Sequence, residues 1–198
     1  MKLSHAMLAL SLTFATTACG SHMKTPDIKK NPHPKMRYEL TMTIKDAPGQ
    51  FDSITGFVQY EVLNKACVPE TGGPMNAMRL APQLDPPLEF TRINDSEYRA
   101  TVYLDRLQDE DYYGLGVCRW SMTGVVTRLR VGKGRFSPDL SPDEVFSQKP
   151  ITRYYVHADY TDRDSEGLRT GESSLSSFDQ AHQIGAFSIT LAAKEASL

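Results

Sequence analysis

His157 is the side chain with the clearest potential for acid–base or nucleophilic chemistry in this sequence. It lies in the segment 154–159 and is the only histidine within a predicted secondary-structure element. Catalysis would require that the fold bring a nucleophile or an acid to it. The sequence has neither a Gly-x-Ser-x-Gly nucleophile turn nor a His-Glu-x-x-His helix. We therefore expect a hydrogen-bonded strand histidine in a protein that is not an enzyme and has no cofactor.

Four acidic residues in the second half of the chain partly fit a calcium loop: Asp159, Asp162, Asp164 and Glu166. Oxygen ligands at alternate positions, followed by a glycine such as Gly167, are typical of such a loop. Arg163 would place a cation inside the site, however. The distal bidentate glutamate is also absent, since its place falls near Leu175. The sequence favours a solvated loop and no bound metal.

Two groups of residues are suited to binding a protein partner. The first is the acidic and aromatic turn Asp109, Glu110, Asp111, Tyr112 and Tyr113. Tyrosine gives an interface a large rigid surface with a polar end, and acidic neighbours steer a basic partner. The second group is basic and lies near Trp120: Arg119, Arg128, Arg130 and Arg135. Each has a simpler alternative: a connecting loop with its tyrosines folded onto the sheet, and alternating charges on a solvent-facing sheet.

The first 18 residues have the pattern of a secretory signal peptide. Lys2 gives the short N-terminal stub a positive charge, and the uncharged segment 6–17 follows. Its apolar part is shorter than the roughly 20 residues that a membrane-spanning helix needs. It ends in small residues, as a signal peptide does. A buried N-terminal helix is the alternative, but the segment has no amphipathic pattern that would pack it on a core.

Cys19 follows small residues in the sequence Thr16-Thr17-Ala18-Cys19-Gly20. This segment resembles the lipobox of bacterial lipoproteins, in which the cysteine is lipidated and becomes the new N-terminus. The resemblance implies an exported protein held on a membrane by lipid on Cys19. Gly20 is not the aspartate that the resemblance associates with the inner membrane, so it implies the periplasmic face of the outer membrane. Cleavage at an ordinary site nearby, giving a soluble periplasmic protein, is the alternative.

Cys67 and Cys118 are expected to form a disulfide bond. If Cys19 carries lipid, these two cysteines remain as an isolated pair, which an oxidising periplasm favours in the bonded form. A metal pair or a catalytic thiol is the alternative. The sequence has no Cys-x-x-Cys, however, and neither cysteine has a histidine at metal-motif spacing. Closing a loop of about 50 residues would stabilise the fold by roughly 4 kcal/mol.

The charge of the chain is close to neutral, which argues against a polyanion-binding protein. Of 22 basic and 24 acidic residues, removal of residues 1–18 takes away only Lys2, so the formal charge of −2 becomes −3. We therefore expect no nucleic-acid partner and no polybasic membrane patch. The proline- and lysine-rich segment 19–35 predicts a flexible tether. Residues 36–198 are long enough for a single domain with a substantial core.

Alternating hydrophobicity predicts seven or eight short strands. The clearest is 37–45, in which every second side chain is apolar. Gly124 is expected to mark a bulge. The remaining strands are expected at 54–63, 98–104, 114–122, 125–131, 152–157 and 186–193, with weaker candidates at 78–84 and 88–93 on either side of a Pro-Pro pair that excludes a central strand.

The few other signals leave the fold class all-β. Ser141-Pro142-Asp143-Glu144 predicts one short helix near 141–147, because it places an N-cap, a first-turn proline and two acids in order. The polar, Gly- and Ser-rich segment 159–183 predicts a long loop. An antiparallel β-sandwich is expected, with Trp120 as a bulky core residue. A partly open β-barrel is the alternative.

The sequence Gly-Leu-Gly-Val-Cys-Arg-Trp at 114–120, together with the lipobox-like segment, resembles the periplasmic immunity lipoproteins of interbacterial killing systems. Such proteins accompany toxic effectors delivered by type IV or type VI secretion. The resemblance implies a protein that binds and inhibits an effector, a peptidoglycan hydrolase or a lipase, where the effector arrives. It assigns no binding residues. A structural or assembly lipoprotein of the cell envelope is the alternative.

Overall fold

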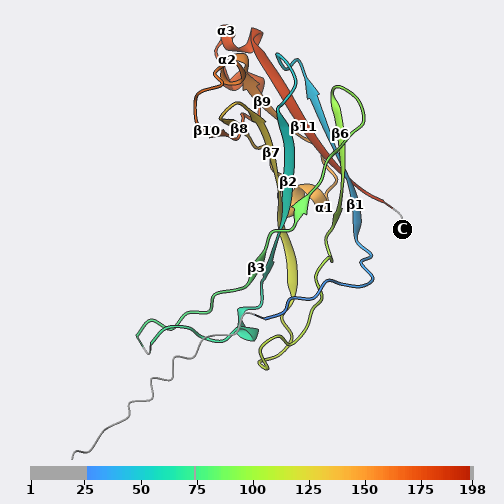
Figure 1. Cartoon of the computed structure of the whole chain (residues 1–198), viewed down its shortest axis with the longest axis vertical. Helices are drawn as coiled ribbons and strands as arrows, with labels where there is room; N and C mark the ends of the chain where they lie inside the picture. Colours follow the sequence, from blue (N-terminus) through green and yellow to red (C-terminus); the bar gives the residue numbers. More distant parts are fainter. Residues whose placement is uncertain (1–25, 74, 197–198) are drawn as a thin grey trace, which may run out of the picture.

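The computed structural model describes residues 26–73 and 75–196, which form two mainly antiparallel β-sheets packed face to face (Figure 1). The predicted all-β class is confirmed. Within the described residues the two sheets remain separate and do not close into a barrel, so the sandwich is the arrangement observed. The predicted signal peptide, Cys19 and the first part of the predicted tether lie outside the described residues.

The first sheet has five strands and joins the two ends of the domain. Its order is β5 (Thr91–Arg92), β6 (Glu97–Tyr103), β1 (Arg37–Lys45), β11 (Ala186–Glu195) and β9 (Ile151–Val156). All four pairings are antiparallel. The central strand β1 is the clean alternating segment of the sequence, with Tyr38, Leu40, Met42 and Ile44 buried.

The second sheet has six strands, ordered β10 (Gly167–Arg169), β8 (Gly134–Phe136), β7 (Trp120–Val131), β2 (Ser53–Val62) and β3 (Gln83–Leu84), with β4 (Pro87–Leu88) also paired to β2. Only the β10–β8 pair is parallel among the described strands. The predicted bulge is present, because Gln59 pairs with Gly124 but Tyr60 pairs with Met122. Pro87 lies on a sheet edge, where its missing N–H costs no ladder bond.

The core lies between the sheets and is filled by alternate residues of both. Fully buried side chains include Met42 and Ile189 of the first sheet and Leu129 and Phe136 of the second. Phe136 makes an edge-on contact with Tyr155, with ring centroids 5.2 Å apart. Burying such large apolar surfaces from both sheets is the main driving force for their association.

A partly buried hydrogen bond between Tyr60 and Tyr103 links the two sheets. The Tyr60 hydroxyl on β2 donates to the backbone carbonyl of Tyr103 on β6 at 2.5 Å. Burial raises the pKa of Tyr60 to about 12, because the phenolate would lose its hydration inside the core. This hydrogen bond satisfies the one polar atom of an otherwise apolar side chain.

The predicted short helix is confirmed as α1 (Pro142–Phe146), with Ser141 and Glu144 forming a capping box. The prediction of a loop over 159–183 is wrong in part. The structure has α2 (His157–Thr161), β10, a 3-10 turn at Leu175–Ser177 and α3 (Gln180–Ile184). Elements of three to five residues are too short to give a periodic signal. Among the described residues, no helix has the length and hydrophobicity to cross a membrane.

Three predicted strands differ from the structure. The strand expected at 114–122 begins only at Trp120, since Gly114 and Gly116 have φ values of 73° and 105°, outside the β region. The candidate at 78–84 is reduced to β3. The candidate at 88–93 is split, because β4 joins the second sheet and β5 joins the first. The intervening residues 89–90 carry the chain from one sheet to the other.

Residues 28–36 lie against the segment 105–110, so the last part of the predicted tether belongs to the domain. The side-chain amide of Asn31 donates to the backbone carbonyl of Asp105 at 2.8 Å. The carboxylate of Asp105 in turn accepts the backbone N–H of Lys35 at 2.7 Å. The low hydrophobicity of this segment predicted a free chain, but these polar contacts and the packing of Ile28 against the core hold it on the domain.

Candidate functional site

Two long excursions of the chain come together at one end of the sandwich and form what we call the disulfide lobe. The first, residues 63–82, follows β2, and the second, residues 105–119, precedes β7. Both leave the paired strands β2 and β7, which brings their bases together (Figure 1). Most residues that the sequence singled out for binding lie in this lobe.

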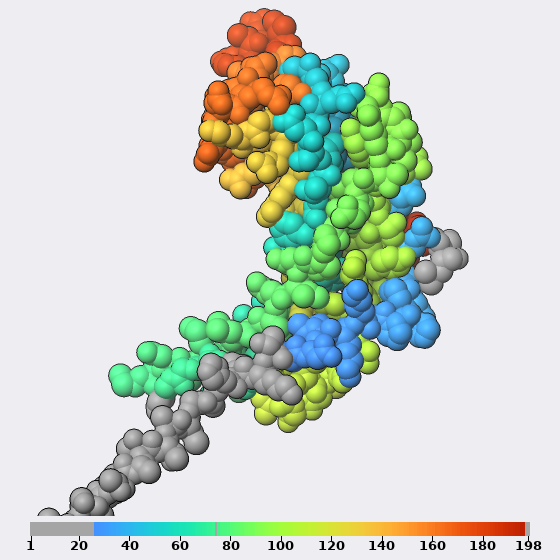
Figure 2. All heavy atoms as spheres, viewed as in Figure 1, coloured from blue at the N-terminus to red at the C-terminus, as the bar shows by residue number. Residues whose placement is uncertain are grey.

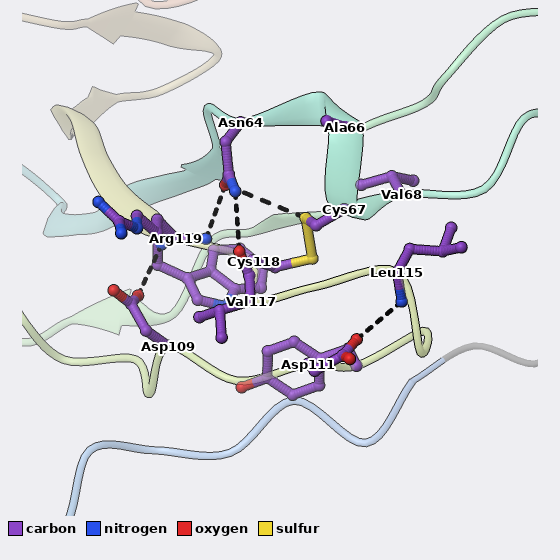
Figure 3. The surroundings of a disulfide bond; sticks show 12 residues. Asn64, Ala66, Cys67, Val68, Asp109, Asp111, Leu115, Val117, Cys118 and Arg119 are labelled. Carbon is purple, nitrogen blue, oxygen red and sulfur yellow. Dashed lines mark hydrogen bonds between the residues drawn. A yellow bond between two sulfur atoms is a disulfide. The ribbon is translucent and has the colours of Figure 1, made fainter.

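A disulfide bond between Cys67 and Cys118 joins the two excursions, as predicted (Figure 3). Their Cα atoms are 5.3 Å apart, and 51 positions separate them in the sequence. Both cysteines are buried in a small apolar cluster with Val62 and Val68. Trp120 packs on this cluster and also on the main core, so the lobe and the sandwich share one continuous apolar interior.

Asn64 provides a second link between the excursions (Figure 3). Its Nδ2 donates to the carbonyl of Val117 at 2.8 Å, and its Oδ1 accepts the backbone N–H of Arg119 at 2.8 Å. The backbone N–H of Leu63 also donates to the carbonyl of Arg119. The side chain of Asn64 thus extends the β2–β7 pairing beyond the point where the regular ladder ends.

The acidic turn, Asp109 to Tyr113, uses its carboxylates within the molecule. Asp109 accepts the backbone N–H of Trp120 at 2.9 Å, and Asp111 accepts that of Leu115 at 3.0 Å. Glu110 forms an ion pair with Lys29 at 2.6 Å, which raises the pKa of that lysine. These bonds fix the shape of the loop, and they leave less of its charge available to steer a partner.

The tyrosines of the turn fold onto the lobe. Tyr112 and Tyr113 are partly buried against the disulfide cluster. The Tyr112 hydroxyl donates to the carbonyl of Gln108 at 2.7 Å, and burial raises the pKa of Tyr113. The geometry therefore matches the simpler alternative for this segment, a connecting loop whose tyrosines cover apolar surface.

Arg119 does not join the other arginines of the predicted basic group. It is exposed at the base of the disulfide lobe, between the buried Cys118 and the partly buried Trp120. Arg128, Arg130 and Arg135 lie together on the outer face of the second sheet instead. The structure thus divides the group into one residue in the lobe and three on the sheet.

The part of the lobe that projects farthest, residues 69–73 and 75–81, carries exposed apolar side chains; we call it the arm. Exposure is 96% for Met75, 56% for Met78 and 62% for Leu80. Leu63, Leu115 and Val117 of the same lobe are also exposed. The lobe therefore holds six of the twelve large apolar side chains that are exposed in the described chain. Figure 2 shows the arm extending well beyond the sandwich.

Internal bonds hold the arm in shape. Thr71 and Met78 exchange backbone hydrogen bonds at 2.8 and 2.9 Å, forming a small hairpin. Arg79 donates to the carbonyl of Ala66 at 3.0 Å and pairs with Glu70 at 3.1 Å. Sequence reasoning missed the arm. A signal was present, since residues 72–78 combine a Gly-Gly turn with two methionines outside any alternating pattern.

A pocket of about 400 Å³ opens where the lobe meets the sandwich. Met36, Leu107, Trp120 and Phe146 are among its lining residues, and Phe146 is half exposed. The indole Nε1 of Trp120 is buried without a hydrogen-bond partner among the described residues. The pocket also has polar lining residues, among them Asp105 and Asp109, and no residue of the arm contributes to it.

The other predicted sites have structural partners. His157 begins α2 instead of lying in a strand, and its Nε2 lies 2.9 Å from the carbonyl of Asp46. In the acidic run, Asp159 pairs with Arg169 at 2.9 Å. Asp162 accepts the backbone N–H of Ser165 at 3.2 Å. In the part of the chain that the structure describes, no three His, Cys, Asp or Glu side chains are grouped as metal ligands would be.

Comparisons with known proteins give no relative: no protein-family model, curated protein or solved structure matches this chain.

Proposed function

We propose that this chain is an exported lipoprotein of the bacterial envelope that binds and inhibits a toxic effector acting in the periplasm. The effector class proposed is a peptidoglycan hydrolase or a lipase, delivered by an interbacterial secretion system. The signal-peptide pattern of residues 1–18 and the lipobox-like segment at Cys19 support the location. The Cys67–Cys118 disulfide supports an oxidising compartment.

The arm is the observation that carries the inhibitory role. Soluble proteins rarely leave several large apolar side chains together in solvent unless a partner covers them. Methionine is favoured at such surfaces because its side chain adapts to the shape of the partner. A projection braced by internal hydrogen bonds fits a concave surface, as long loops of binding proteins do. The active-site cleft of a hydrolase is such a surface, and filling it would exclude substrate.

Toxin neutralisation tests the proposal directly. Deleting the gene together with its neighbours should sensitise cells to a toxin encoded beside it, and restoring this gene alone should protect them. Purified mature protein should bind that toxin and suppress its activity. If the protein binds no product of the adjacent genes, the proposal fails. Co-purification with a membrane complex instead would favour a structural or assembly lipoprotein.

Arm variants separate the inhibitory surface from the rest of the molecule. The triple substitution Met75→Ser, Met78→Ser and Leu80→Ser should abolish protection while the protein remains folded, because all three side chains are exposed. Ile184→Ser is the matched control, since Ile184 is 84% exposed on α3, far from the arm in Figure 1. Equal protection by the triple variant and the control would contradict inhibition through the arm.

The lipid anchor has its own test. Mass spectrometry of the N-terminus of the native protein should find a lipidated Cys19, and Cys19→Ser should release the protein from the membrane fraction. An unmodified N-terminal residue other than Cys19 would disprove the anchor. That result would leave the inhibitory role of the arm to be judged by the toxin assays.

A further inference from the structure

Three arginines on the outer face of the second sheet and a lysine in the adjoining turn gather into a surface that we call the cationic face. Arg130 on β7 lies directly opposite Arg135 on β8. Arg128 precedes Arg130 by two residues, so both point to the same side of the sheet. Lys133 lies in the tight turn between the two strands. Together with Glu166, three of the cations line a shallow cleft of about 270 Å³.

The fold makes little use of these charges. None of the four cations forms an ion pair with another described residue. Like charges directly opposite each other on neighbouring strands destabilise a sheet. The nearby carboxylate of Asp52 is already engaged: it accepts hydrogen bonds from the Arg163 guanidinium at 2.8 Å and from the backbone N–H of Gly132 at 2.7 Å. Arg163 and Gly132 lower the pKa of Asp52 most, and Arg130 contributes less. The close placement of Arg130 and Arg135 is thus expected to cost stability, and a binding role would account for it.

Arg128 is positioned in advance for binding. Its guanidinium carbon lies 4.7 Å from the centre of the Phe57 ring, so the cation rests on an aromatic face. This contact restricts a side chain that would otherwise lose much rotational freedom on binding. The N–H groups of a stacked guanidinium remain available to form paired hydrogen bonds with a carboxylate.

We propose that the cationic face binds a protein partner through a cluster of carboxylates on the surface of that partner. Leu168, 57% exposed on β10, lies opposite Arg135 and adds apolar surface beside the cations. Arginine together with aromatic and apolar side chains is typical of protein interfaces. The carboxylate of Glu166 in the cleft would repel a phosphate dianion more strongly than a singly charged carboxylate, and the chain as a whole carries a net charge of −2.

This inference goes beyond the proposed function, because it concerns a second surface and names the charge of the protein that contacts it. The strands β8 and β10 lie at the end of the molecule away from the disulfide lobe (Figure 1). A variant of either surface therefore leaves the other intact. If the cationic face does not bind while the arm still inhibits, this inference fails alone. If the arm does not inhibit while the cationic face binds, the inhibitory role fails alone.

Binding of an acidic peptide tests the cationic face without knowledge of the natural partner. A peptide of ten glutamates, added at low salt to the ¹⁵N-labelled mature protein, should shift the NMR signals of Arg128, Arg130 and Arg135. Arg130→Glu should weaken binding of the peptide at least about tenfold. Lys149→Glu is the matched control, because it makes the same change in net charge at an exposed site elsewhere. Equal weakening by the two substitutions would overturn the proposal.

Two other probes test the class of ligand. Inorganic polyphosphate and vesicles containing phosphatidylglycerol should shift these arginine signals less than the glutamate peptide does. If either shifts them while the peptide does not, the face binds phosphate groups and the proposal of a carboxylate-bearing protein is wrong. The absence of shifts with all three probes would overturn it as well.

Thermal unfolding provides an independent readout. Arg130→Glu replaces a like-charge pair by an opposite-charge pair with Arg135, so the variant should unfold at a higher temperature than the natural chain. Arg135→Gln, which only removes the repulsion, should also raise the midpoint. Greater stability combined with weaker peptide binding is the expected result. A fall in the midpoint for both variants would show that the arginines stabilise the fold, and would overturn the proposal.

Discussion

The side-chain oxygen of Asn64 accepts the backbone N–H of Arg119 at 2.8 Å, just beyond the last regular pair of β2 and β7. The amide nitrogen of the same side chain donates to the carbonyl of Val117. One side chain therefore supplies both an acceptor and a donor to the opposite excursion. Few residues other than asparagine can do both at this distance from the backbone.

Substitution of Asn64 should loosen the lobe. Asn64→Ala leaves a donor and an acceptor of the opposite excursion without their partner, and should lower the free energy of unfolding by about 1–3 kcal/mol. Asn64→Asp retains the acceptor but places a carboxylate beside the carbonyl of Val117, so it should also destabilise the protein. Urea denaturation measures both changes. If Asn64→Asp were as stable as the natural chain, the hydrogen bond to the carbonyl of Val117 would contribute little to stability.

Removal of the disulfide should destabilise the whole domain. The double substitution Cys67→Ala and Cys118→Ala opens a loop with a sequence separation of 51 residues, and the expected loss is about 4 kcal/mol. Hydrogen exchange should increase most in residues 63–82 and 105–119, because the bond joins these two excursions. If the double variant were as stable as the natural chain under non-reducing conditions, Asn64 and the apolar cluster would be sufficient to hold the lobe.

Alkaline pH should remove the contribution of Tyr60 to stability. The pKa of a tyrosine is about 10 in an unfolded chain, and it is about 12 for Tyr60 in the fold. The folded state therefore keeps the proton more strongly. This contribution is complete below pH 10 and decreases as the pH rises towards 12.

Tyr60→Phe separates this effect from the other tyrosines. At pH 7 the variant should be less stable by about 1 kcal/mol, because the hydrogen bond to the carbonyl of Tyr103 is lost. Between pH 10 and 12 the difference should shrink, since only the natural chain has this phenol to ionise. Denaturation curves at pH 7 and 11 give the comparison, and a constant difference would contradict the raised pKa.

The negative charge of Asp139 should contribute less to folding stability than its hydrogen-bond acceptors do. Its carboxylate accepts the backbone N–H of Thr127 at 2.9 Å and the Ser137 hydroxyl at 2.7 Å. Burial nevertheless raises its pKa, more than these bonds lower it. With a raised pKa, its contribution to stability is largest below pH 4 and is lost as the pH rises through the folded value.

Two substitutions of Asp139 test this balance. Asp139→Asn keeps an acceptor oxygen and removes the buried charge, so its stability at pH 7 should equal or exceed that of the natural chain. Asp139→Ala leaves the N–H of Thr127 without an acceptor and should lose about 1–3 kcal/mol. Thermal unfolding at pH 4 and 7 provides the measurement. Equal losses for both variants would mean that the charge itself is stabilising.

The sequence predicted the sandwich well because its strands have one buried and one exposed face. Long alternating segments such as 37–45 and 186–193 can bury their apolar side chains only as strands. The capping box at Ser141 similarly determined the position of α1. The disulfide was predictable because an exported chain would leave Cys67 and Cys118 as a pair. In each of these cases a local pattern has one low-energy structure.

The candidate site was harder to predict because long-range contacts determine it. Nothing near Asn64 in the sequence indicates that it will meet Arg119, since the meeting depends on the β2–β7 register. From the sequence, the carboxylates of Asp109 and Asp111 were expected to be available to a partner. In the fold they accept the backbone N–H groups of Trp120 and Leu115 instead. The exposure of Met75 depends in the same way on how its excursion is braced.

The pairing of β1 with β11 has a consequence for the order in which the molecule folds. Leu40 lies opposite Ala193, so the centre of the first sheet joins segments from the two ends of the domain. Contacts so distant in sequence make folding slow, because a long loop must close before they form. A chain that crosses a membrane unfolded, N-terminus first, cannot complete this sheet until its last strand has crossed. In the exported protein that we propose, this topology would therefore delay completion of the first sheet until translocation is finished.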